Sequence, residues 1–378
     1  MAIAVSDLQD LITTTQKELG ELRWTEIATD LQDHVALSSL LQESRVQFSA
    51  GTSVQWNVMV ENSGLAKDTS LFATDEVNIG DVMKTAEIGW RHQTVNYAIE
   101  RREIAFNRDP RRIVDLVAVR RADAMISLAE HMEKRFWGAP STANDLKMNG
   151  VAYWVTTSGS APAAGSGGFL GGDLFAGGTA GLSSTTYPRW QNWWGKYNAS
   201  ELDGTFDGSG NDYGDGTASS GNFPVLPLVK QMREAYVKTG FKPVYNANVP
   251  TYNTGDRWGI YAGYAQVSGL ENIVERLNDK VTSSDLQPQA GRVMFRGVPV
   301  TYVPHLDTAS GGPIYMLNWG TFHPIFLEGE YMREMGPDIA PNQHTTLVTH
   351  IDCTVNTYCT DRRRNAVLST DTVTIPNS

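Results

Sequence analysis

Cysteine is scarce in this 378-residue chain, since Cys353 and Cys359 are the only two. Both lie in one stretch that we expect to be a strand, where an extended chain would hold them about 20 Å apart. That separation is far beyond the reach of a disulfide. We therefore expect both cysteines to be reduced, as is usual in the cytoplasm.

Long apolar runs and an excess of basic residues are also missing. No apolar segment approaches the roughly 18 residues of a membrane-spanning helix, and the first residues lack the basic start and apolar centre of a signal peptide. We expect neither a membrane span nor an export signal. The net charge of −11 argues against nucleic acid as a tightly bound partner, because neutralising phosphates needs a basic surface. The net charge does not exclude a protein that encloses nucleic acid without binding it tightly.

Sequence motifs of catalysis and metal binding are absent as well. There is no phosphate-binding glycine loop, dinucleotide fingerprint, nucleophile elbow or HExxH zinc motif. His344 and His350 are the closest histidine pair, but six residues apart in a strand they cannot share one metal ion. The best match to a calcium loop, at 207–218, has Asp212 where glycine is required and Ala218 where a bidentate glutamate is required. We expect no catalytic residue, no cofactor and no metal site.

The N-terminal part predicts an arm followed by a hairpin. Residues 4–45 have apolar residues at helical spacing and predict two short amphipathic helices, the second over about 24–41. In SVQWNVMVE (53–61) apolar and polar residues alternate, which predicts a strand. A second extended stretch is expected over about 86–106, and the polar segment between the two includes Lys67. The pattern favours a projecting β-hairpin.

The longest predicted helix begins at Asp109, a good N-cap, and ends at Gly138. Pro110 suits its first turn, and apolar residues from Ile113 to Phe136 form one stripe. At 1.5 Å per residue the helix spans about 40 Å. Its other faces carry acidic residues mixed with basic ones, among them Arg111, Arg112, Arg120 and Arg121. These charges belong either to a solvated face with weak ion pairs or to contacts between neighbouring subunits.

Residues 157–222 differ in composition from the rest of the chain, because 16 of the 66 are glycine. They contain YPRWQNWWGKY (187–197), and we favour its tryptophans as a small local core or an anchor between subunits: Trp190, Trp193 and Trp194. The alternative is a platform that stacks on sugars, with Glu201 and Asp203 as the carboxylates that a glycosidase needs. From 226 onward the pattern is mixed α/β. It predicts helices over about 226–239 and 271–279, strands over 292–306 and 313–320, and one very long strand within 344–360.

This order of parts resembles the major capsid proteins of tailed double-stranded-DNA bacteriophages, the HK97-fold family. The segments that carry the likeness are EKRFWGAPST (133–142), FRGVPVTYVPHLD (295–307), PIYMLNWGTFHPIF (313–326) and DRRRNAVLS (361–369). The resemblance implies an α+β fold. Its parts would be an N-terminal arm (1–48), an extended loop formed by a long β-hairpin with the entry to the peripheral domain (49–106), the peripheral domain with its spine helix (107–156), a Gly/Trp-rich insertion (157–222), a mixed α/β axial domain (223–335), and the return strand and C-terminus of the peripheral domain (336–378).

By the same resemblance we expect a structural subunit, not an enzyme. It would self-assemble through hexamers and pentamers into an icosahedral capsid in the virion, after assembly in the host cytoplasm, and would enclose double-stranded DNA without sequence-specific binding. Its partners would be itself and portal, scaffolding and decoration proteins, with no membrane. We expect the arginines to pair with acidic residues across subunit boundaries, so that charge reversal at Arg120 and Arg121 blocks assembly of a folded subunit. The inter-subunit contact candidates are Arg111, Arg112, Arg120, Arg121, Lys67, Trp190, Trp193, Trp194, Arg362, Arg363 and Arg364.

Three other hypotheses remain. An encapsulin-like compartment would use the same fold to enclose a cargo protein. A secreted carbohydrate-binding or carbohydrate-hydrolysing protein would use the Trp-rich segment and would need an export signal. A phage tail or fibre protein is disfavoured because no internal repeat is visible.

Overall fold

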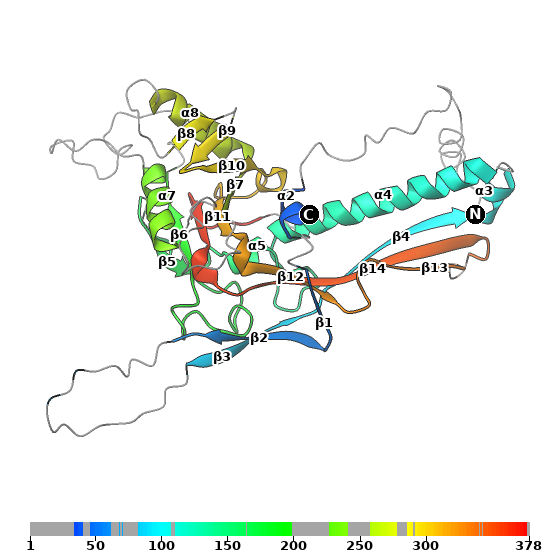
Figure 1. Ribbon diagram of the computed structural model, residues 1–378, viewed down its shortest axis with the longest axis horizontal. Helices are drawn as coiled ribbons and strands as arrows, with labels where there is room; N and C mark the ends of the chain where they lie inside the picture. Colours follow the sequence, from blue (N-terminus) through cyan, green and yellow to red (C-terminus); the bar gives the residue numbers. More distant parts are fainter. Residues whose placement is uncertain are drawn as a thin grey trace.

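The structure is a computed structural model. It describes residues 34–40, 46–61, 68, 70, 82–106, 110–163, 165–198, 227–240, 258–277, 286–289, 292–339, 341 and 343–375. A long helix, α4, runs from a mixed α/β body along an extended sheet, and a two-stranded hairpin leaves the same body on the other side of that sheet (Figure 1). The predicted α+β class is confirmed.

Helix α4 (Pro110–Trp137) confirms the prediction for the longest helix. The side chains expected to form its apolar stripe include Leu128, Met132 and Phe136, and these are buried. The C-terminal end of α4 packs tightly on Gly150, where an added Cβ would lie only 2.2–2.6 Å from three carbonyl oxygens of residues 135–138. Only glycine allows the chain to approach the end of the helix this closely.

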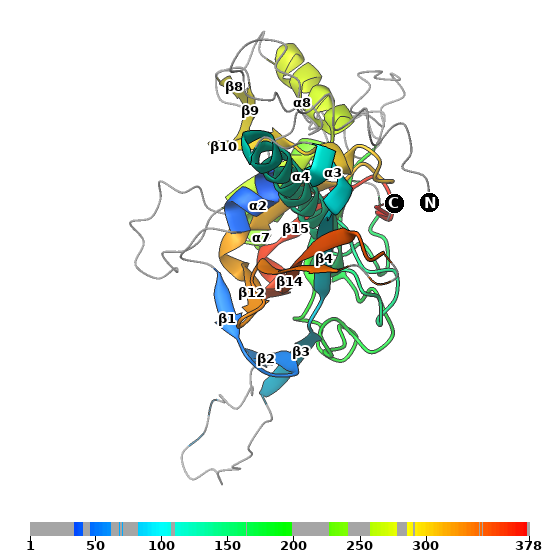
Figure 2. The ribbon, with the colours of Figure 1, turned by 90° about the vertical axis from the view of Figure 1, so that its right-hand side faces the viewer.

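The first sheet has five strands, and its longest strand, β14 (Thr346–Cys359), joins two regions. The first half of β14 lies between β4 (His92–Glu100) and β13 (Arg333–Ile339), and all its pairings there are antiparallel. The second half pairs with β12 (Phe322–Leu327), which pairs in turn with β1 (Gln47–Ser49). Helix α4 lies along β4, so this sheet is covered on one face (Figure 2). The very long terminal strand predicted from the sequence is confirmed.

The second sheet has eight strands and forms the body, in the order β5-β6-β15-β11-β7-β10-β9-β8. Helices α7 (Pro227–Lys238) and α8 (Tyr264–Leu277) pack on it. Its strands are β5 (Gly167–Gly171), β6 (Asn192–Lys196), β7 (Trp258–Ala262), β8 (Leu286–Gln289), β9 (Arg292–Phe295), β10 (Val298–Tyr302), β11 (Ile314–Asn318) and β15 (Ala366–Ser369).

This sheet combines segments that the sequence suggested were separate. β5 and β6 come from the presumed insertion, β7 to β11 from the presumed axial domain, and β15 from the C-terminal segment. β15 lies between β6 and β11 and pairs with both. The described part of 157–222 is therefore built into the central sheet and is not an appendage of it.

Two local predictions differ from the structure. The single strand expected over 292–306 is a tight hairpin of β9 and β10, because Arg296 (φ 48°) and Gly297 (φ 85°) form a two-residue turn. The stretch expected over 86–106 is broken at Trp90 and Arg91 and ends in helix α3 (Arg101–Phe106). Its first part, β3 (Met83–Gly89), pairs with β2 (Ser53–Met59), which confirms the predicted hairpin.

Several predictions fall outside the described residues. These are the first amphipathic helix, the segment of 62–67 that includes Lys67, and the weak calcium-loop match at 207–218. Of the second amphipathic helix, the structure describes α2 (Val35–Leu40).

Candidate functional site

The most heavily bonded charged side chain in the described structure is Arg362, at the start of a short 3-10 helix (Arg362–Arg364). Its guanidinium is fully buried. It donates hydrogen bonds to the carbonyl oxygens of Trp154 (2.8 Å), Gly172 (2.8 Å) and Trp190 (2.9 Å). The three acceptors belong to α5 (Val151–Trp154), to the loop that follows β5 and to the loop that precedes β6. Arg362 therefore ties the C-terminal segment to the presumed insertion.

The counter-ion of Arg362 is Asp173, at 3.5 Å. The Asp173 carboxylate also accepts hydrogen bonds from the backbone N–H and the hydroxyl of both Thr179 and Ser184. Burial lowers the pKa of Arg362 to about 10, while Asp173 opposes that shift. The guanidinium thus stays protonated at neutral pH, and the pair holds the loop between β5 and β6 in one arrangement.

These contacts correct the prediction for Arg362. A side chain with no exposed surface in the single subunit cannot form an ion pair with a neighbouring subunit. Its neighbours in the run of three arginines are placed differently: Arg363 stacks over the ring of Phe169 at 4.7 Å, and Arg364 lies 3.5 Å from Asp361. Arg363 and Arg364 remain candidates for contact with another copy, because both reach the surface.

The three tryptophans of the presumed insertion are core residues. Trp190, Trp193 and Trp194 are all buried. The indole N–H of Trp194 donates to the Ser369 hydroxyl at 2.9 Å, and that of Trp190 donates to the carbonyl oxygen of Thr179 at 3.1 Å. They are core residues, but of the two large clusters and not of a small local core, since Trp190 and Trp194 belong to one and Trp193 to the other. Their burial speaks against a sugar platform, and an anchoring role between subunits stays a prediction.

Two arginines of α4, Arg120 and Arg121, have their acceptors within the same chain. Arg120 forms a two-pronged ion pair with Glu103 (2.8 and 3.1 Å) and also donates to the carbonyl oxygen of Ala98. Arg121 pairs with Glu334 on β13 at 2.6 Å. The first pair joins α4 to α3 and the second joins it to β13. Both are contacts within the subunit, and contact of these arginines with a neighbouring subunit stays a prediction. The side chains of Arg111 and Arg112 lie outside the described residues.

One buried carboxylate attaches the N-terminal arm to the long helix. Glu133 accepts hydrogen bonds from the backbone N–H groups of Ala36 (3.0 Å) and Leu37 (2.9 Å) at the start of α2, and from the indole N–H of Trp137 (2.9 Å). Two otherwise unpaired N–H groups of α2 are thereby satisfied. No feature of the sequence distinguishes Glu133 from the other charged residues of the helix, so its role was missed.

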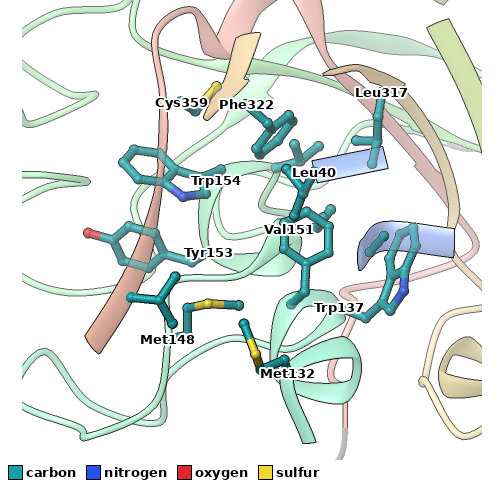
Figure 3. Close-up of a cluster of buried hydrophobic side chains, with 14 of the residues drawn as sticks. Leu40, Met132, Trp137, Met148, Val151, Tyr153, Trp154, Leu317, Phe322 and Cys359 are labelled. Atoms are coloured by element: carbon teal, nitrogen blue, oxygen red, sulfur yellow. The ribbon is translucent and has the colours of Figure 1, made fainter. Parts of the chain in front are cut away.

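Figure 3 shows the apolar cluster into which this contact is set. Leu40 of α2, Met132 and Trp137 of α4, Trp154 of α5 (Val151–Trp154), and Cys359 of β14 all belong to it. Both cysteines are free, as predicted. Burial raises the pKa of the Cys359 thiol to about 12, so it is a neutral core residue and not a nucleophile.

Replacing Glu133 by glutamine should loosen the arm. A glutamine offers one acceptor oxygen where two N–H groups and an indole now bind the carboxylate, so at least one buried donor loses its partner. We expect the free energy of unfolding to fall by about 1–3 kcal/mol, measured by urea denaturation of the subunit. The control is Asp123→Asn, an exposed acid on the same helix, which should change stability by less than about 0.5 kcal/mol. Equal effects of the two substitutions would contradict the anchoring role.

Within the described part of the chain, no group of three or more His, Cys, Asp or Glu side chains is placed to hold a metal ion. No helix among the described residues has the length and apolarity needed to cross a membrane.

The sequence matches no protein-family model and, at a significant level, no curated protein. Its fold does match solved structures. The capsid asymmetric unit of cyanophage A-1(L) superposes with a TM-score of 0.57 and 15% identity, over 95% of this chain and 99% of that one.

Two further structures are similar over comparable lengths. A capsid of a native GTA particle gives a TM-score of 0.49 at 13% identity, covering 93% of this chain and 96% of that one. An encapsulin complex from Synechococcus elongatus gives 0.45 at 10% identity, covering 98% and 97%. Both scores lie below 0.5, so the fold assignment depends on the cyanophage match and on the arrangement of arm, hairpin, long helix and two sheets. Together these observations give the chain an HK97-like capsid fold.

Proposed function

We propose that this chain is the structural subunit of a closed protein shell, the capsid of a tailed double-stranded-DNA bacteriophage. The proposal is supported above all by the likeness to the cyanophage capsid subunit over nearly the whole of both chains. The subunit would assemble through hexamers and pentamers in the host cytoplasm, with portal, scaffolding and decoration proteins as further partners. The net charge of −11 suits a container that holds DNA without binding it tightly.

The hairpin of β2 and β3 supports self-assembly on physical grounds. The hairpin packs on the body through Val54, Ala86 and Ile88, which are buried. In this hairpin Met59 and Met83 pair directly and are 65% and 55% exposed. A closed shell repeats heterologous contacts around rings, and such a projecting hairpin supplies contact area that the body alone does not have.

The first experiment is electron microscopy of the purified, recombinantly expressed protein, with sedimentation velocity on the same sample. We expect icosahedral shells, or hexameric and pentameric rings. Nucleic acid protected from nuclease in shells purified from infected cells would support the phage assignment, and a co-purifying protein cargo would favour a compartment instead. A protein that stays monomeric at high concentration, with or without a co-expressed scaffold, would contradict the proposal.

Polar substitution of both methionines should impair assembly without unfolding the subunit. Burying a methionine side chain contributes about 1.5–3 kcal/mol, so Met59→Ser with Met83→Ser should raise the concentration needed for assembly at least tenfold. The unfolding midpoint should not change, because both side chains are already exposed. The control is Leu146→Ser, which removes an 83% exposed side chain from the loop after α4. Assembly of the double variant at the wild-type concentration would show that the hairpin end does not contact a neighbour.

A further inference from the structure

A small cavity of about 230 Å³ lies at the base of the hairpin, where β3 meets the loop after α4 and the loop between β5 and β6. We call it the hairpin-base pocket. Its volume is below that of ordinary cofactor and drug sites, and suits a small ion or the end of one side chain. Four polar side chains line it: Glu87, Arg91, Asn149 and Tyr153.

The Arg91 guanidinium has no counter-ion among the residues that the structure describes. Its one side-chain hydrogen bond to a described residue runs to the carbonyl oxygen of Ala143 at 3.4 Å. Arg91 is partly buried, and its Nε is enclosed without an acceptor. A partly desolvated cation without a partner is costly to the fold, which favours an anion from outside.

Two neutral donors stand beside this cation. Asn149 is only 5% exposed, and its backbone groups are bonded to Asn356 and Thr357. Its side-chain amide has no hydrogen-bond partner within the described chain. The Tyr153 hydroxyl accepts a hydrogen bond from the backbone N–H of Ala180 at 2.9 Å and donates to no described residue. Burial raises the pKa of Tyr153, so the hydroxyl keeps its proton.

The rest of the lining includes residues 175–178, 180 and 181 of the loop between β5 and β6. At Gly177 and Gly181 an added Cβ would meet no atom within 4 Å, so no side chain or backbone crowds these two positions. Asp173 holds the same loop through its hydrogen bonds with Thr179 and Ser184. The pocket is thus lined by a loop that contacts within the chain hold in place.

We propose that the hairpin-base pocket binds a small oxyanion, held by the Arg91 guanidinium and by the Asn149 and Tyr153 donors. One acidic residue, Glu87, also lines the pocket. It is exposed and makes no ion pair with Arg91. Its charge weakens the binding of a fully ionised anion, so its removal should strengthen binding. The oxyanion is either a free one, such as phosphate, or the carboxylate of a second copy, and the second source rests on the proposed shell function.

The test is calorimetric titration of the dissociated full-length subunit with inorganic phosphate and with acetate, at constant ionic strength set by chloride. We expect one site per subunit. Arg91→Gln should weaken it roughly 10- to 100-fold, because a hydrogen bond to a charged group is lost, and Glu87→Gln should tighten it. The matched control is Arg102→Gln, which removes an arginine that is 60% exposed and should leave the affinity unchanged.

Repeating the titration on assembled shells distinguishes a free oxyanion from the carboxylate of a second copy. Binding to subunits and shells alike identifies a free anion, and binding to subunits alone identifies a neighbour's carboxylate that fills the pocket on assembly. Wild-type subunits that bind neither probe, or an Arg91→Gln variant that binds as wild type does, would overturn the inference. The titration of dissociated subunits does not require that shells form. Its result is therefore independent of the proposed function.

Discussion

Replacing Arg362 by methionine should lower the free energy of unfolding of the subunit by about 3–5 kcal/mol. The substitution keeps much of the side-chain volume but removes the cation from a site with no exposed surface. The Asp173 carboxylate then loses its counter-ion, and three carbonyl oxygens lose their donor. Removing one partner of a buried ion pair lowers the stability by more than the intact pair contributes to it, because the remaining charge stays desolvated. Urea denaturation of the dissociated subunit measures the loss.

The adjacent arginine provides a matched control for this substitution. Arg363 has the same charge and lies in the same short helix, but it is exposed and stacks on Phe169. Arg363→Met should cost at most about 1 kcal/mol, the value of an exposed cation–π contact. If the two variants are equally stable, Arg362 does not hold the body together as described.

Truncating Trp194 to alanine should have an effect of similar size, about 3–5 kcal/mol. Its indole is fully buried in the larger of the two apolar clusters, and its N–H donates a hydrogen bond to the Ser369 hydroxyl on β15. The loss should appear in the unfolding of the isolated subunit, because the ring packs within its own chain. The control is Leu146→Ala at an exposed position, for which we expect less than about 0.5 kcal/mol.

The Trp194 experiment also decides between the two interpretations that the sequence left open. A residue that anchored one subunit to another would leave subunit stability unchanged and impair assembly alone. Normal unfolding of Trp194→Ala together with failed assembly would therefore contradict the burial described here.

Elements with strong local signals could be predicted from the sequence. Helix α4 has an N-terminal proline, an apolar stripe and a glycine stop, and it ends at Trp137 directly before that glycine. The alternation in β2 and the long run in β14 are equally local properties. Each of these patterns involves residues that are close in the sequence, so it can be recognised without knowing how the rest of the chain folds. The turn at Arg296 was missed because an arginine with positive φ is rare.

The candidate site depended on contacts between distant residues and was predicted less well. The run at 362–364 offers three identical side chains, and nothing in the sequence distinguishes the buried one from the other two. Likewise, the glycine-rich composition of 157–222 suggested an insertion, although β5 and β6 extend the eight-stranded sheet beside β15. The amino-acid composition of a segment indicates how flexible the unfolded chain is. It does not indicate which sheet a strand of that segment joins in the folded protein.

By itself the sequence determined the elements with strong local periodicity, their order and, through the resemblance of that order, the capsid-like fold. The tertiary structure decided which charges face solvent and which are buried. Arg120, Arg121 and Glu133 found their partners on strands and helices brought to α4 by folding. The physical reason is that periodicity is set by the geometry of a single element, whereas the partners of a side chain depend on what folding places beside it.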